Sequence, residues 1–225
     1  MFAQLLPLAV GAALSPTLLV MQLVILTGDA RALTRAWALA AGRMASLLAI
    51  TIGGASLLAR LPDFDTGLTA SPAAGVILVV AGAVLLALAV RAVRRPASPD
   101  PSDSSGRAQR LIDAPPASLF VLGAAWMLIN ASTLALYIPG LHVVSRSDVS
   151  WPARLSGIAV LYLAAAAAAL GPPLALSVFG ETIRPRLERV QAWMERNGRT
   201  IGLVVSVVFG VAMCAAGGWN LLSPS

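Results

Sequence analysis

Charged residues are scarce in this sequence, and their scarcity sets the class of protein. Only 12% of the 225 residues are charged, whereas 58% are hydrophobic. A typical soluble domain carries about 25% charged residues. The mean hydropathy of +0.82 points the same way. This balance excludes an ordinary soluble domain and predicts an integral membrane protein.

Several kinds of chemistry also lack the residues they need. The single cysteine, Cys214, excludes an internal disulfide and paired-thiol redox chemistry. There is no phosphate-binding Walker loop, and no cluster of His, Cys, Asp and Glu has the spacing of metal ligands. No acid, base and nucleophile converge in any motif. We therefore expect no enzymatic activity, no cofactor and no metal site.

Lysine is absent altogether, so every basic residue is an arginine. The net charge of +6 could indicate either nucleic acid or membrane partners. With so little soluble surface, membrane orientation explains the charge better, and we expect membrane lipids rather than nucleic acid as partners.

Long apolar runs are abundant. Each is long enough for a helix that crosses a hydrocarbon core about 30 Å thick. The sequence therefore predicts an all-α membrane protein with six transmembrane helices. The runs span about 3–27, 35–59, 73–93, 117–140, 153–180 and 200–222.

The arginines predict how these helices are oriented. Twelve of them lie in the connections after the first, third and fifth runs, and three lie on the opposite side. Because cytoplasmic connections are enriched in basic residues, both termini should lie outside the cytoplasm. We expect a multi-pass protein of the plasma membrane, bacterial in origin.

The connection 94–116 divides the chain into two sets of three runs. It is rich in Pro, Ser and Asp, which predicts a disordered cytoplasmic linker between a first repeat (1–93) and a second (117–225). Three is an odd number, so a duplicated half would return with inverted topology. "GAALSPT" (11–17) matches "GAAWMLINAST" (123–133), and "VVAG" (79–82) matches "VVFG" (207–210). Matches this short also arise by chance in membrane helices.

Another connection, about 181–197, has apolar residues at helical spacing and arginine and glutamate on the other face. It predicts a short helix lying in the inner headgroup layer. The alternative is a solvated connector.

Polar residues interrupt the first and fourth runs near their midpoints. Pro16 cannot donate a helical hydrogen bond, and Asn130 lies at a similar depth. Inverted-repeat transporters place broken helices at the midplane, where freed backbone groups meet the substrate. The alternative is a pair of kinks whose Ser and Thr side chains bond back to the backbone. The candidate binding residues at these points are Ser15, Pro16, Thr17, Asn130, Ser132 and Thr133.

Arg43 is the one charge deep inside a run, and insertion of an arginine there costs at least about 2.5–3.5 kcal/mol. It either awaits an anionic substrate group or bonds to backbone carbonyls or to the headgroups. Pro172, in the "GPP" of the fifth run, should lie at a similar depth and could free carbonyls for Arg43. Gln22 completes the candidate substrate-binding set.

The first run, "LPLAVGAALSPTLLVMQLVILTG", and the polar break in the fourth resemble the lysine-exporter (LysE) superfamily. "RALTRAWALAAGR" is similar to its GAP branch, the lipid-addressing proteins of mycobacteria and relatives. The resemblance implies a transporter or flippase that exports an anionic amphipathic lipid or glycolipid toward the envelope. A small-solute exporter and a non-transporting scaffold of a lipid-synthesis or export complex are the alternatives. A homodimer or an envelope-biosynthesis partner is compatible with each.

Overall fold

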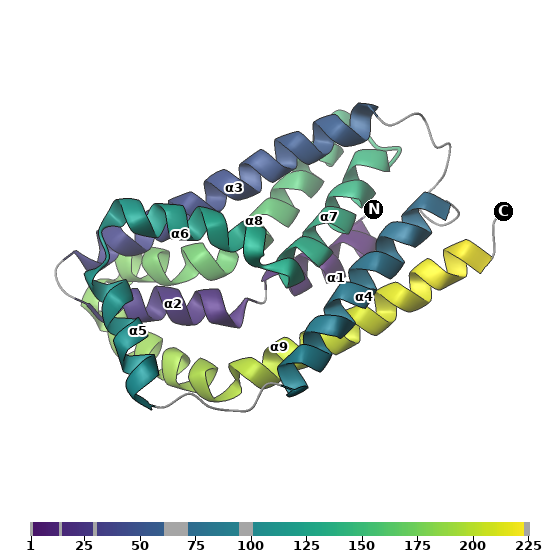
Figure 1. Cartoon of the computed structure of the whole chain (residues 1–225). Helices are drawn as coiled ribbons and strands as arrows, with labels where there is room; N and C mark the ends of the chain where they lie inside the picture. Colours follow the sequence, from purple (N-terminus) through teal and green to yellow (C-terminus); the bar gives the residue numbers. More distant parts are fainter. Residues whose placement is uncertain (1, 14, 29–30, 61–71, 95–100, 223–225) are drawn as a thin grey trace.

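The computed structural model describes residues 2–13, 15–28, 31–60, 72–94 and 101–222, and every regular element in these ranges is helical (Figure 1). This agrees with the predicted all-α class. The elements are α1 (Phe2–Ala13), α2 (Pro16–Leu26), α3 (Ala32–Arg60), α4 (Pro72–Arg94), α5 (Pro101–Asp113), α6 (Pro116–Ile129), α7 (Ala131–Arg146), α8 (Trp151–Phe179), the 3-10 turn η1 (Gly180–Ile183) and α9 (Arg184–Leu222).

Three helical stretches are long and apolar enough to cross a membrane: 32–54, 75–94 and 151–219. Two bent pairs, α1 with α2 and α6 with α7, raise the number to five if each pair is one span. The third stretch has 69 residues, more than three times the roughly 20 that cross a bilayer. Gly180 divides it, with a φ of +59° that favours glycine. The six-span inverted repeat stays a prediction.

Two connections differ from what the sequence predicted. The segment expected to be a disordered linker contains helix α5, which is amphipathic and packs against α2, with Ile112 beside Gly28 just after that helix. The expected separate interfacial helix at 181–197 is instead the first part of α9, which continues without a break to Leu222. Local composition missed both because tertiary contacts stabilise helices that are marginal alone.

Helices α4 and α9 pack antiparallel along most of their length, at a distance set by glycines. A Cβ on Gly82 would lie 2.7 Å from the Gly210 carbonyl oxygen, and one on Gly217 would lie 2.7 Å from that of Gly75. Gly82 and Gly210 end the two matched tetrapeptides "VVAG" and "VVFG". Small residues of this kind let membrane helices approach closely.

Glycines also allow α3 and α6 to pack closely. A Cβ on Gly42 would collide with the Phe120 carbonyl oxygen, and one on Gly123 with that of Leu39. The Ser46 hydroxyl donates to the Ala124 carbonyl at 3.0 Å across this contact. The second half of the chain is thus packed directly onto the first.

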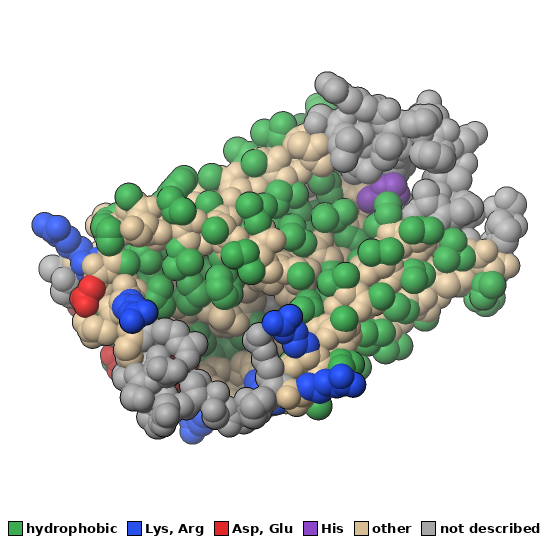
Figure 2. Space-filling view, in the orientation of Figure 1, with side chains coloured by type: hydrophobic (Ala, Val, Ile, Leu, Met, Phe, Trp, Pro, Cys, Tyr) green, Lys and Arg blue, Asp and Glu red, His purple; other side chains and the backbone are tan. Residues whose placement is uncertain are grey.

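Charge is concentrated at one end of the molecule. On the face shown in Figure 2, hydrophobic side chains cover most of the surface, further arginines lie at the C-terminal end of α4, and arginine and acidic side chains gather at the end where α3 and α9 begin. There Arg184 pairs with Glu181 at 2.6 Å and donates to the Leu26 carbonyl at the end of α2. We call this the basic end; it gathers the arginine-rich connections that the sequence assigned to the cytoplasmic side.

Adding one methyl group at Gly82 should destabilise the protein. Gly82→Ala places a Cβ against the Gly210 backbone, and overpacking of this kind costs about 1–3 kcal/mol. Gly202→Ala is the control, because Gly202 lies in α9 with nothing within 4 Å of its Cβ position. Its helix propensity should improve by about 0.8–1.0 kcal/mol. Thermal unfolding in detergent should therefore shift in opposite directions, and equal midpoints would contradict close packing of α4 on α9.

Candidate functional site

The two broken helices touch each other at their breaks. The α1–α2 pair bends by 42° and the α6–α7 pair by 69°. The Asn130 side-chain amide donates to the Ser15 hydroxyl at 3.2 Å, joining residues 115 positions apart. The two polar breaks, for which the sequence predicted only a similar depth, therefore lie in contact, and we call this contact the crossing.

Each break has a local cause. Pro16 is the first residue of α2, where its missing N–H would be unpaired anyway and its fixed φ suits a helix start. No proline follows Asn130; this one residue caps both α6 and α7. Its N–H donates to the Trp126 carbonyl at 2.9 Å, and its side-chain oxygen accepts the Thr133 N–H at 3.4 Å. An asparagine in this role stabilises a helix start by about 1 kcal/mol.

The other predicted residues at the crossing differ in their surroundings. The Ser132 hydroxyl donates to the Asn130 side-chain oxygen at 2.7 Å, and Thr133 is buried beside it. Thr17, by contrast, is exposed and takes no part in these bonds. A role for Thr17 in substrate binding stays a prediction.

Gln22 binds a carbonyl that a proline has released. Pro173 has no N–H, so the Ala169 carbonyl loses its helical partner. The fully buried Gln22 amide donates to that oxygen at 2.8 Å and to the Ala36 carbonyl at 3.1 Å. Gln22 thus ties α2 to α3 and α8. Pro172 is buried within α8, which runs on unbroken to Phe179, so the "GPP" segment does not open the helix.

Arg43 is the largest fully buried side chain of the described residues. Its Nε and Nη2 donate to the Ala165 carbonyl at 3.3 and 3.1 Å, one turn before the oxygen that Gln22 takes. Arg43 thus binds Ala165, not a carbonyl freed by the two prolines. Its Nη1 has no hydrogen-bond partner among the described residues, and none of their carboxylates neutralises it. A buried charge without a counter-ion is costly.

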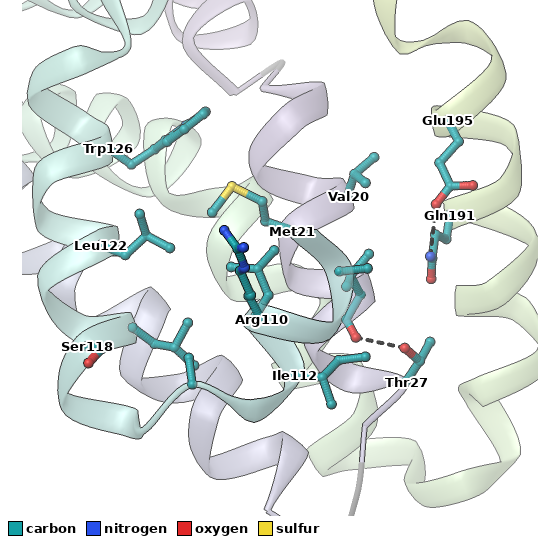
Figure 3. Close-up of a pocket in the computed structure, with 15 residues that line it drawn as sticks. Val20, Met21, Thr27, Arg110, Ile112, Ser118, Leu122, Trp126, Gln191 and Glu195 are labelled. Atoms are coloured by element: carbon teal, nitrogen blue, oxygen red, sulfur yellow. Dashed lines mark hydrogen bonds between the residues drawn. The ribbon is translucent and has the colours of Figure 1, made fainter. Parts of the chain in front are cut away.

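A large groove lies between α2 and α6 near the basic end (Figure 3). Its volume is about 1100 Å³, and α5 and the start of α9 form its remaining walls. We call it the α2–α6 groove. Its lining is mainly apolar, including Val20, Met21, Val24, Leu119, Leu122 and Trp126.

Polar groups stand at separate places on this apolar wall. Arg110 of α5 points into the groove, and no described residue pairs with it. On the α9 wall, the Gln191 amide donates to the Glu195 carboxylate at 2.9 Å. Trp126 lies at the far end, and its indole N–H is buried without a partner in the described part of the chain. The groove can thus accept a long apolar ligand that carries polar atoms.

Helices α1 and α7 pack tightly against each other. Gly11 of α1 faces Leu136 of α7 so closely that a Cβ would lie 2.8 Å from the leucine Cδ1. Leu5, Leu8 and Leu161 are buried in the same core. Packing is therefore tight where α1 meets α7, whereas a groove separates α2 from α6.

Sequence reasoning missed the groove and the residues that line it. Arg110 lay in the segment taken as linker, and Trp126 looked like one more apolar residue of its run. The available signal for an amphipathic helix was the helical spacing of Arg107 and Arg110 beside the apolar pair Leu111 and Ile112. Nothing local shows that this helix covers a cavity.

Apolar spans, two broken helices and buried polar side chains define a multi-pass α-helical membrane protein. The particular family follows from the sequence: the model of Sap, sulfolipid-1-addressing protein, matches residues 5–218, nearly the whole chain. The chain belongs to this family. No curated protein and no solved structure matches it significantly.

The Asn130–Ser15 bond should appear as coupling between two substitutions. Asn130→Ala removes the cap of α7 and should cost about 0.5–2 kcal/mol. Its combination with Ser15→Ala should cost less than the sum of the single changes, by about 0.5–1.5 kcal/mol. Thr17→Ala is the control and should add independently to Asn130→Ala. Unfolding free energies in detergent measure both cycles; an additive Ser15 cycle would contradict the crossing.

Proposed function

We propose that this protein carries an anionic amphipathic lipid across the membrane on its way to the cell envelope. The observation that carries the proposal is the α2–α6 groove: an apolar cavity of about 1100 Å³ lined by Arg110, which pairs with none of the described residues. Membership in the sulfolipid-1-addressing family supports a role in lipid movement. The groove supplies what that role needs, a place for acyl chains next to a place for a charged head.

The polar groups of the groove favour a headgroup that is both anionic and rich in hydroxyls. The Arg110 guanidinium can bind a sulfate, phosphate or carboxylate through two parallel hydrogen bonds. Across the groove, the Glu195 carboxylate and the Gln191 amide can accept hydroxyl protons, as a sugar would offer them. The Trp126 N–H, still without a partner, can donate to a linkage oxygen deeper in the groove. A glycolipid bearing one acidic group satisfies all three.

The alternatives fit the groove less well. A small polar solute would leave most of a largely apolar wall exposed and unused. A scaffold subunit would need no cavity at all, nor two helices broken inside the spans and held together by a polar contact. The broken helices instead support a carrier, since transporters of this type build their sites from interrupted helices.

The proposed architecture treats α8 and α9 as two spans, giving six with the bent pairs. In the inverted repeat, α1 and α2 then correspond to α6 and α7, α3 to α8, and α4 to α9. The contact between Gly82 and Gly210 supports this, because matched segments meet across the proposed pseudo-twofold axis. With the basic end in the cytoplasm, the α2–α6 groove lies near the inner side of the membrane. Placement in the LysE superfamily and its GAP branch is part of the same proposal.

Arg43 is the second anion-binding group in this proposal. Its Nη1 is buried and unpartnered, and its charge lacks a counter-ion among the described residues. The anionic headgroup would supply a hydrogen-bond acceptor for Nη1 and a counter-ion for the guanidinium as it passes the middle of the protein. In the present conformation Arg43 is fully buried, so the headgroup reaches it only after the helices around it separate.

Closing the groove should abolish lipid binding, and removing its charge should weaken selectivity. In proteoliposomes, phosphatidylglycerol with a photoreactive acyl chain should label 116–129 more strongly than the matching phosphatidylcholine. Leu122→Trp should suppress both by filling the cavity. Arg110→Gln should reduce the preference for the anionic lipid about 1.4- to fivefold, because an exposed ion pair contributes about 0.2–1 kcal/mol.

Arg94→Gln is the control, since Arg94 is an exposed arginine of α4 that does not line this groove. If Arg110→Gln and Arg94→Gln retain the same preference, Arg110 does not bind the headgroup. If 116–129 is not labelled in the parent protein, the groove is not a lipid site and the proposed function fails.

Replacing Arg43 should weaken binding of the anionic lipid without preventing insertion of the protein. Arg43→Gln should insert normally, because removing the charge relieves the cost of burial. Its affinity for phosphatidylglycerol should fall roughly 10- to 150-fold, the effect of losing about 1.5–3 kcal/mol from a charge-assisted bond. Arg43→Lys should be intermediate, since an ammonium lacks the planar fork. Unchanged affinity in Arg43→Gln would show that Arg43 only joins α3 to α8.

A further inference from the structure

A second groove lies between α4 and α7, outside the site described above. Its volume is about 370 Å³, one third of that of the α2–α6 groove, and its lining is entirely apolar. Val80 and Val84 line it from α4, and Ala131, Leu134 and Ile138 line it from α7. We call it the α4–α7 groove.

The two grooves approach the crossing from opposite sides of the same break. The α2–α6 groove reaches Trp126, the residue whose carbonyl accepts the Asn130 N–H. The α4–α7 groove begins at Ala131, the residue directly after Asn130, and continues along α7 to Pro139. One groove thus ends one turn before the break, and the other starts one residue after it.

The walls of the second groove admit hydrocarbon and little else. The described residues around it contribute no polar side chain, so a headgroup, sugar or peptide would lose its hydrogen bonds there. Val80 and Ile138 are about half exposed on the lipid-facing surface, at 56% and 47%. A chain lying in the bilayer can therefore enter from the side without crossing water.

We propose that the α4–α7 groove binds an acyl chain of the transported lipid on the far side of the crossing. The inference rests on the proposed function and adds a second chain-binding site to it. The lipid head passes the polar crossing while its chains move from the α2–α6 groove to the α4–α7 groove. The second groove lacks any counterpart of Arg110, so it holds the chains and leaves the head free to depart.

Filling the second groove tests this directly. Val80→Trp places a bulky side chain in the groove, and Val80 is exposed enough to be changed without disturbing the core. Val208→Trp is the matched control: it is the same residue type, 57% exposed, at the corresponding position of the matched segment "VVFG", and it does not line the groove. Both variants are reconstituted in proteoliposomes with photoreactive phosphatidylglycerol.

We expect labelling of 131–146 in the parent protein and in Val208→Trp, and its loss in Val80→Trp. Translocation of the lipid should fall below that of the parent in Val80→Trp alone, because the indole fills the space that the acyl chain would occupy. Labelling of 116–129 should not change. If Val80→Trp matches Val208→Trp in both measurements, the second site is overturned while the first groove stands. If 116–129 is not labelled in the parent, the proposed function itself fails.

Discussion

Backbone N–H and C=O groups inside a membrane must have hydrogen-bond partners, and the rest of the structure depends on this constraint. No water is available there, so each interrupted helix must find partners within the protein. Asn130 meets the need at one break by capping two helices at once, and Gln22 meets it in α8 by binding the carbonyl that Pro173 releases. The Asn130 cap and the Gln22 bond therefore satisfy part of the backbone that these interruptions free.

The same partners determine which helices stay together. Gln22 and Arg43 both donate to carbonyls of α8, one turn apart, so α2 and α3 are both held to that helix. Glycines set the other long contacts, of α4 with α9 and of α3 with α6. Between these fixed contacts, α2 and α6 are left apart, and the large groove occupies the space that neither glycine nor polar contact closes.

The sequence identified the parts of this arrangement that depend on single residues. Pro16 and Asn130 predicted the breaks, whereas the hydrogen bond that joins them, from Asn130 to Ser15, was not predicted. The grooves could not be predicted, because they depend on how far helices stand from one another, and no local pattern encodes that distance. Helix α5 was missed for a related reason: its polar composition favours disorder, but Ile112 packs beside Gly28 just after α2, and the Arg35 guanidinium donates to the Ala114 carbonyl at its end.

The tight contact between α1 and α7 also bears on how the membrane keeps its electrical potential. Water can follow a charged headgroup into the open groove, but beyond the crossing Leu5, Leu8, Leu136 and Leu161 form a dry core in the described structure. A hydrated ion would have to shed its shell to enter that core, which is prohibitively costly in hydrocarbon. In this conformation the α2–α6 groove does not continue through this core as a pore, and the proposed lipid binding would leave the proton and ion gradients across the bilayer intact.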